Sequence, residues 1–197
     1  TVVQNLVEAL LEKGVDVTLF APADWKTPAK HIPTLEKSLW NMKDFKRQSI
    51  KVRSNLIVLS QMKVINFQND FDIIHLHSQR YAFVVAKLSK KPCVLSFHNK
   101  ITLPEFKQTE KAGMHTVSLS KSQRGELRTE AMIWNGVPTK KIRYSFEGGS
   151  YLMTIGRLTD QKGTDTAIKI AKRTGKKLLI FGRKGDSIIR QEYFNQK

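Results

Sequence analysis

Residues 71–97 read FDIIHLHSQRYAFVVAKLSKKPCVLSF, and this stretch decides the fold class. Its first part, residues 71–77, is mostly apolar and predicts a buried strand, as does its last part, residues 92–97. Between them, apolar residues recur at helical spacing and predict a short helix: Tyr81, Val84, Val85 and Leu88. A strand, a helix and a strand in this order favour a parallel sheet with right-handed crossovers.

The same alternation continues toward the N-terminus. Residues 3–11 place apolar side chains on one face and predict a helix, which Gly14 ends as a left-handed cap. Residues 15–20 predict a strand, and we expect another strand before Thr1, because this helix and strand are half of a βαβ unit. Residues 24–53 mix lysines, prolines and aromatic residues, which predicts a long loop with one or two short helices before a helix over 56–64.

The pattern also continues toward the C-terminus, where a break divides it into two series. Strands are predicted at 116–119 and 131–134, with a short helix at 122–128 between them. Residues 143–150 end in Gly148-Gly149, which predicts a hinge. A second series follows, with strands at 151–155 and 177–181 and a helix between them closed by Gly175. We therefore predict two α/β domains, residues 1–147 and 148–197, the second of them incomplete.

The composition and motifs of the chain favour some partners and exclude several classes of enzyme. The 197 residues hold 34 Lys and Arg against 17 Asp and Glu, a net charge of +17, which favours an anionic partner such as nucleic acid, an acidic bilayer or a phosphorylated substrate. The single cysteine, Cys93, cannot form an internal disulfide and is predicted to be a small core residue in a reducing compartment. We expect no cleavable signal and no membrane span, because no apolar run is long enough. The motifs of serine hydrolases, nucleotide triphosphatases, dinucleotide oxidoreductases and zinc proteases are absent.

Histidines lie within one of the predicted strands and directly after another. Ligands of parallel sheets collect at the carboxyl ends of strands, so His98 and Asn99, directly after residues 92–97, are candidate site residues or plain loop residues. His75 and His77 point to the same side of one strand, at a spacing that metal sites can use. No cysteine or third histidine is near them in the sequence, so structural histidines are the favoured interpretation.

The segment Gly156–Gly163 predicts an anion site. A strand ends at Gly156, Arg157 follows at once, and a short loop delivers Lys162 and Gly163 to the start of a helix. Free amides and the positive end of the helix dipole attract anions there. The Arg157 guanidinium and the Lys162 ammonium could converge on the same phosphate. A tight loop with solvated basic residues is the alternative.

These motifs resemble those of family 4 glycosyltransferases, which have the GT-B fold of two Rossmann-like domains. Gly156-Arg157-Leu158 with Lys162-Gly163 is similar to the Gly-Arg-Leu…Lys-Gly motif that opens the family's C-terminal domain. The resemblance runs from Thr1 nearly to Lys197 and is weakest between Asp24 and Asp70. Five further segments resemble the family's motifs in the expected order: 14–18, 71–77, 94–99, 116–120 and 134–137.

The resemblance implies transfer of a sugar from a nucleotide-sugar to a sugar or lipid-linked acceptor, with retention at the anomeric carbon and no metal or cofactor. Arg157 and Lys162 would stabilise the departing diphosphate, with Gly156 and Gly163 at the same phosphate site. His98 would face the donor sugar. Three residues would line the cleft: Asn99, Asn135 and Gly136. The family's Gly-rich loop would lie before Thr1 and its acidic pair beyond Lys197, so we expect little transferase activity from residues 1–197 alone.

Other functions stay open from the sequence. A sugar-nucleotide epimerase or a phosphorylase would keep the GT-B fold and change the chemistry. Nucleic acid is not the expected partner, because the lysines are dispersed and not interleaved with aromatic residues. We expect a cytoplasmic protein. The segment Lys26–Arg53, with Trp40, Met42 and Phe45, is a candidate for peripheral contact with an anionic membrane, and a surface loop is its alternative.

Overall fold

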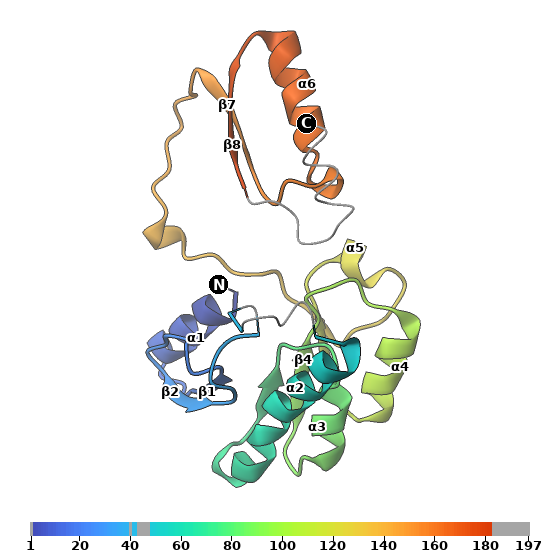
Figure 1. The fold of residues 1–197 in the computed structure, drawn as a ribbon. Coiled ribbons are helices and arrows are strands. Elements are labelled where there is room, and N and C mark those ends of the chain that lie inside the picture. Colours follow the sequence, from blue (N-terminus) through green and yellow to red (C-terminus); the bar gives the residue numbers. More distant parts are fainter. Residues whose placement is uncertain (1, 40, 43–47, 183–197) are drawn as a thin grey trace. The chain divides into compact units, whose positions relative to one another are not determined.

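The computed structural model describes residues 2–39, 41–42 and 48–182, and the chain divides into two compact units, Thr1–Thr139 and Lys140–Lys197 (Figure 1). The short 3₁₀ turn η3 (Thr139–Lys141) lies at the division. The expected domain boundary after residue 147 therefore falls within the second unit, and so do Gly148 and Gly149.

The larger sheet of the first unit is parallel throughout. It contains β3 (Ile74–Leu76), β4 (Cys93–Ser96), β5 (His115–Ser118) and β6 (Ala131–Met132), in that spatial order. Leu95 at its centre pairs with Leu76 on one side and Thr116 on the other. The α/β class and the parallel pairing predicted from the sequence are confirmed, and the carboxyl ends of these strands share one edge.

Helices pack on this sheet and bury its apolar residues. They are α2 (Ile50–Met62), the 3₁₀ segment η2 (Lys63–Asp70), α3 (Ala82–Leu88), α4 (Leu103–Lys111) and the short α5 (Lys121–Arg124). Val85, Leu95 and Phe97 have no exposed surface, and Cys93 is buried beside them in the same core cluster, as predicted. Burial of this kind contributes about 1.5–3 kcal/mol for each large side chain. The helix α4 was not predicted.

A second, two-stranded parallel sheet lies near the N-terminus of this unit. It pairs β1 (Thr18–Ala21) with β2 (Lys30–Pro33), and α1 (Val2–Glu12) precedes it. The ring of Phe20 meets Phe67 and Phe71 edge-on at 5.8 and 5.7 Å, which connects this sheet to η2 and to the residue that directly follows it. Gly14 has φ +76°, so its predicted left-handed conformation is confirmed. The prediction of a long loop over 24–53 is wrong for residues 30–33, which form the strand β2.

The second unit repeats the strand–helix–strand order in miniature. β7 (Tyr151–Ile155) pairs in parallel with β8 (Lys177–Phe181) over all five residues of each strand, as predicted. Between them lie the 3₁₀ turn η4 (Asp160–Lys162) and α6 (Thr164–Thr174), which ends at the left-handed Gly175. In the part of the chain that the structure describes, no helix is sufficiently long and apolar to cross a membrane.

Candidate functional site

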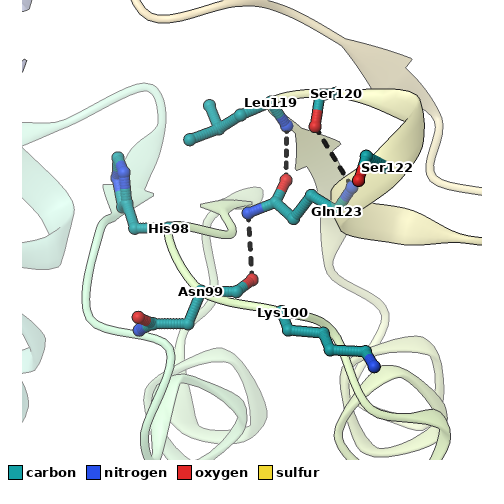
Figure 2. Close-up of a pocket in the computed structure, with 7 residues that line it drawn as sticks. All are labelled: His98, Asn99, Lys100, Leu119, Ser120, Ser122 and Gln123. Atoms are coloured by element: carbon teal, nitrogen blue, oxygen red, sulfur yellow. Dashed lines mark hydrogen bonds between the residues drawn. The ribbon is translucent and has the colours of Figure 1, made fainter. Parts of the chain in front are cut away.

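A cavity opens at the carboxyl ends of β4 and β5. Its volume is about 430 Å³, it is open to solvent, and its lining comes from the loop after β4 and from the turn into α5 (Figure 2). The predicted crevice residues His98 and Asn99 both belong to it. The full lining is His98, Asn99, Lys100, Leu119, Ser120, Ser122 and Gln123.

Gln123 holds the two halves of this cavity together. Its amide Nε2 donates to the carbonyl oxygens of Phe97 at 2.7 Å and Asn99 at 2.9 Å, and its Oε1 accepts from the backbone N–H of Leu119 at 2.6 Å (Figure 2). The Ser120 hydroxyl accepts from the Gln123 backbone N–H at 3.1 Å and caps α5. One side chain thus fixes both loops that line the cavity.

Gln79 holds the loop after β4 from its other side. Its Oε1 accepts from the backbone N–H of Asn99 at 3.3 Å, and its Nε2 donates to the carbonyl of Lys100 at 3.4 Å and to Glu105 Oε2 at 3.3 Å. Glu105 also forms a capping box with Thr102 at the start of α4. The Asn99 backbone is therefore bound at both its N–H and its C=O, which gives His98 and Asn99 a defined position.

Three histidines lie together beside the cavity. His77 Nδ1 is 3.0 Å from His98 Nε2, and His75 Nε2 is 2.9 Å from the hydroxyl of the buried Ser96. The rings of His75 and His77 have centroids 4.2 Å apart, and those of His77 and His98 are 5.3 Å apart. The favoured interpretation of His75 and His77 as hydrogen-bonded structural residues agrees with these contacts.

Burial keeps this histidine cluster neutral. Desolvation lowers the pKa of His98, and desolvation with the nearby charge of His98 lowers the pKa of His75. The pKa of His77 falls to about 3, chiefly by desolvation and then by the charges of His75 and His98. A neutral imidazole donates from one ring nitrogen and accepts at the other. Among the described residues, no group of three His, Cys, Asp or Glu side chains could hold a metal ion.

The cavity can therefore recognise hydroxyl groups. Two serine hydroxyls, the two amides of Asn99 and Gln123, and a neutral imidazole line it together with one ammonium, that of Lys100. Each of these neutral groups can donate or accept, which suits the ring hydroxyls of a sugar. A neutral imidazole can also accept a proton or donate one at physiological pH.

The loop between β7 and α6 is where the sequence predicts an anion site. Gly163, in the left-handed conformation at φ +66°, is the N-cap of α6 and has no side chain that could cap the helix. Lys162 is exposed, and its aliphatic stem lies over Gly156, with its Cγ 3.6 Å from the point that a Cβ of residue 156 would occupy. Arg157 is half-buried. The predicted strand, loop and helix start are all confirmed.

The remaining candidate residues lie elsewhere. Asn135 and Gly136 follow β6, are exposed, and do not belong to the lining of the cavity. In the candidate membrane segment, Trp40 and Phe45 lie outside the described residues, and Met42 is half-buried. Sequence reasoning missed Gln79 and Gln123 as organisers of the site, because neither follows a strand end directly.

Comparison with known proteins agrees with this architecture. Residues 1–141 match the family model described as Glycosyltransferase Family 4, which covers the whole larger unit with its cavity and histidine cluster. A search of curated proteins found no significant match. A match over well over half of the chain, on a fold of parallel sheets, shows the family: the chain belongs to glycosyltransferase family 4.

Proposed function

We propose that this glycosyltransferase moves a sugar from a nucleotide-sugar to a hydroxyl of an acceptor, with retention at the anomeric carbon and without a metal or cofactor. The observation that carries the proposal is the start of α6, where the N-cap Gly163 has no side chain and Lys162 and Arg157 stand in the preceding loop. The first four N–H groups of a helix have no partner within the helix. Such a helix start attracts anions.

The chemistry of sugar transfer needs this kind of site. As the glycosidic bond to the nucleotide breaks, negative charge develops on the departing diphosphate, and fixed dipoles and cations stabilise that charge. Arg157 offers a planar fork of N–H donors that matches two phosphate oxygens, and Lys162 offers a mobile point charge. The two residues are expected to lower the energy of the transition state without a divalent ion.

The cavity of the first unit supplies the other requirement, a place for neutral sugar hydroxyls. His98 presents an imidazole there that is neutral at physiological pH, beside the polar side chains of Asn99 and Ser122. These groups can bind hydroxyls without adding a charge that would repel a diphosphate. We propose that they contact the transferred sugar or its acceptor.

Nucleotide binding tests the proposal without requiring turnover. We would titrate the 197-residue chain calorimetrically with UDP, GDP and ADP, and compare Arg157→Gln and Lys162→Gln. We expect at least one nucleotide to bind, and each substitution to weaken it about tenfold, equivalent to about 1.4 kcal/mol. The matched control is Lys172→Gln, which removes an exposed charge from the last turn of the same helix and should change little.

Two results would contradict the proposal: no binding of any of the three nucleotides, or equal weakening by the control. We expect little transferase activity from residues 1–197 alone, so the reaction is tested by proton NMR of the small amount of product formed from UDP-, GDP- and ADP-linked hexoses with a simple sugar acceptor. Retention predicts the same anomeric configuration in product and donor. An isomerised sugar would indicate an epimerase, and a sugar phosphate would indicate a phosphorylase.

A further inference from the structure

We propose that His77 is a positioning residue for His98: it fixes the tautomer and the orientation of the His98 ring, so that Nδ1 is the ring nitrogen left to contact the ligand. The inference rests on the proposed function only in assigning a sugar hydroxyl to His98. The assignment of His77 comes from the geometry of the two rings.

The first step is the contact between the two histidines. His77 follows β3 and His98 follows β4, so neighbouring parallel strands bring together side chains 21 residues apart in the sequence. His77 Nδ1 and His98 Nε2 are 3.0 Å apart, an ordinary length for a hydrogen bond between two nitrogens. Two unprotonated nitrogens at this distance would repel each other through their lone pairs. One nitrogen therefore carries a hydrogen and donates it in a hydrogen bond, and the other is the acceptor.

The second step concerns the tautomer. A neutral histidine carries its hydrogen on either ring nitrogen, and the hydrogen bond made by one nitrogen decides which. If His77 donates, His98 carries its hydrogen on Nδ1 and can donate to a ligand. If His98 donates from Nε2, its Nδ1 is bare and can accept from a ligand. The tautomers of the two rings are therefore coupled: a single tautomer of His77 selects a single tautomer of His98.

The third step concerns the surroundings that hold His77 itself. Its ring lies between two others, with the His75 ring 4.2 Å away on one side and the His98 ring 5.3 Å away on the other. His75 is in turn fixed by the hydroxyl of Ser96, which is buried in β4. A residue that is itself packed and oriented can hold a neighbouring group to a narrow geometry, as site chemistry requires.

The test must separate positioning from ring packing. His77→Phe keeps an aromatic ring between His75 and His98 but removes the nitrogen. His77→Asn loses the ring but keeps a hydrogen-bonding atom two bonds from Cβ, where Nδ1 lies in histidine. His115→Phe, at an exposed histidine of β5 outside the cluster, is the matched control for a change of ring that leaves the His77–His98 contact intact.

The readout is the tautomer of His98. The chain holds five histidines, so long-range proton–nitrogen spectra of the ¹⁵N-histidine-labelled 197-residue protein at about pH 7 are simple to assign. We expect one fixed tautomer of His98 in the natural protein and in His115→Phe, and an averaged signature of two tautomers in His77→Phe. His77→Asn, whose amide can donate from Nδ2 or accept at Oδ1, should restore a hydrogen bond to His98 Nε2, seen in the shift of that nitrogen. A His98 tautomer that stays fixed in folded His77→Phe would overturn the proposal.

Residual turnover supplies a second measurement; we expect little transferase activity from residues 1–197 alone, so where no product forms the tautomer of His98 decides. With whichever UDP-, GDP- or ADP-linked hexose supports transfer, His77→Phe is expected to lower kcat about tenfold and leave KM for the donor nearly unchanged, with recovery in His77→Asn. If the tautomer changes as expected but kcat does not, positioning by His77 stands and the sugar contact of His98 is wrong. If neither changes, the positioning proposal itself is wrong.

Discussion

The side-chain amide of Gln123 donates to the carbonyl oxygen of Phe97 at 2.7 Å, across 26 residues of sequence. Phe97 is fully buried directly after β4, whereas Gln123 lies in α5 after β5. This hydrogen bond therefore connects the exits of two neighbouring strands at the edge of the sheet where the cavity opens. The position of His98, the next residue after Phe97, depends on it.

The first prediction follows from the chemistry of this amide. Gln123→Glu keeps the size of the side chain but replaces the donor by a carboxylate that faces the carbonyl oxygens of Phe97 and Asn99. We expect it to lower the free energy of unfolding by about 1–3 kcal/mol at neutral pH, because both acceptors lose their donor. Urea denaturation at pH 7 measures the change.

Two further variants control this prediction. Gln123→Ala removes the donor without adding a charge and should cost less than the carboxylate does. Gln108→Ala changes an exposed glutamine of α4 and should stay within about 0.5 kcal/mol of the natural protein. Equal stability of Gln123→Glu and the natural protein would show that the amide does not hold the two strand exits together.

A second prediction concerns the backbone at Tyr81. This residue precedes α3 with φ +63°, which makes it, in the part of the chain that the structure describes, the single residue other than glycine with a positive φ. A side chain in the left-handed region costs about 1–2 kcal/mol, and glycine avoids that cost. Comparing Tyr81→Gly with Tyr81→Ala isolates the backbone, because both variants lose the ring.

We expect Tyr81→Gly to be more stable than Tyr81→Ala by about 1 kcal/mol in thermal or urea unfolding. In an ordinary helical position the order is the reverse, because glycine costs about 1 kcal/mol relative to alanine. A more stable alanine variant would thus be clear evidence against a left-handed Tyr81. Because residue 81 closes the loop that contains Gln79, the same pair of variants reports on how firmly that loop is held.

Most of the fold could be predicted because its signals are local. Apolar runs indicated the central strands, and glycines at 14 and 175 indicated helix ends that have the expected left-handed backbone. The strand β2 had no such signal. Its four residues, Lys30–Pro33, include only Ile32 as a large aliphatic side chain, and they form a strand because they pair with β1. Pairing between distant segments cannot be inferred from the residues of one of them.

The helix α4 is a different case, because the sequence contains a signal for the start of a helix there, although no helix was predicted. Thr102 and Glu105 have the spacing of a capping box, with Pro104 in the first turn, and the structure shows both hydrogen bonds of that box. Only some residues of the site could be predicted, because the others are brought together by contacts between distant segments. His98 and Asn99 follow a strand directly, whereas Gln79, Gln123 and the His77–His98 contact depend on the register between strands.

A third prediction follows from the low pKa of His77. An unfolded histidine binds its proton near pH 6.5, whereas folded His77 does so only near pH 3. Between these values the unfolded chain holds the extra proton, so the stability of the fold decreases as the pH falls below 6.5. The slope from this one group is at most about 1.4 kcal/mol per pH unit.

Urea unfolding between about pH 7 and pH 5 measures this slope above the range in which carboxylates titrate. The lowered pKa values of His75 and His98 act in the same direction, so the natural protein should have a steeper slope than one group gives. His77→Phe should reduce this slope by up to about 1.4 kcal/mol per pH unit, which is the contribution of one proton. An unchanged slope in this variant would mean that folded His77 takes up its proton as readily as an unfolded histidine.

The last prediction compares two glycines of the second unit that face each other across its sheet. The backbone N–H of Gly156 donates to the carbonyl of Phe181 at 2.9 Å, which brings Gly182 against the chain at Gly156. A Cβ at residue 182 would overlap the carbonyl oxygen of Gly156, and this backbone atom cannot rotate away. A Cβ at residue 156 would meet only the flexible stem of Lys162, at 3.6 Å or more.

We therefore expect Gly182→Ala to destabilise the β7–β8 sheet by about 1–3 kcal/mol, as overpacking does, and Gly156→Ala to be tolerated. Hydrogen exchange of the amides in β7 and β8 measures the effect within this unit. Faster exchange in Gly156→Ala than in Gly182→Ala would contradict the close approach at Gly182. If the order is as expected, Gly156 is free to serve the anion site, and Gly182 is the glycine that the packing of the strands requires.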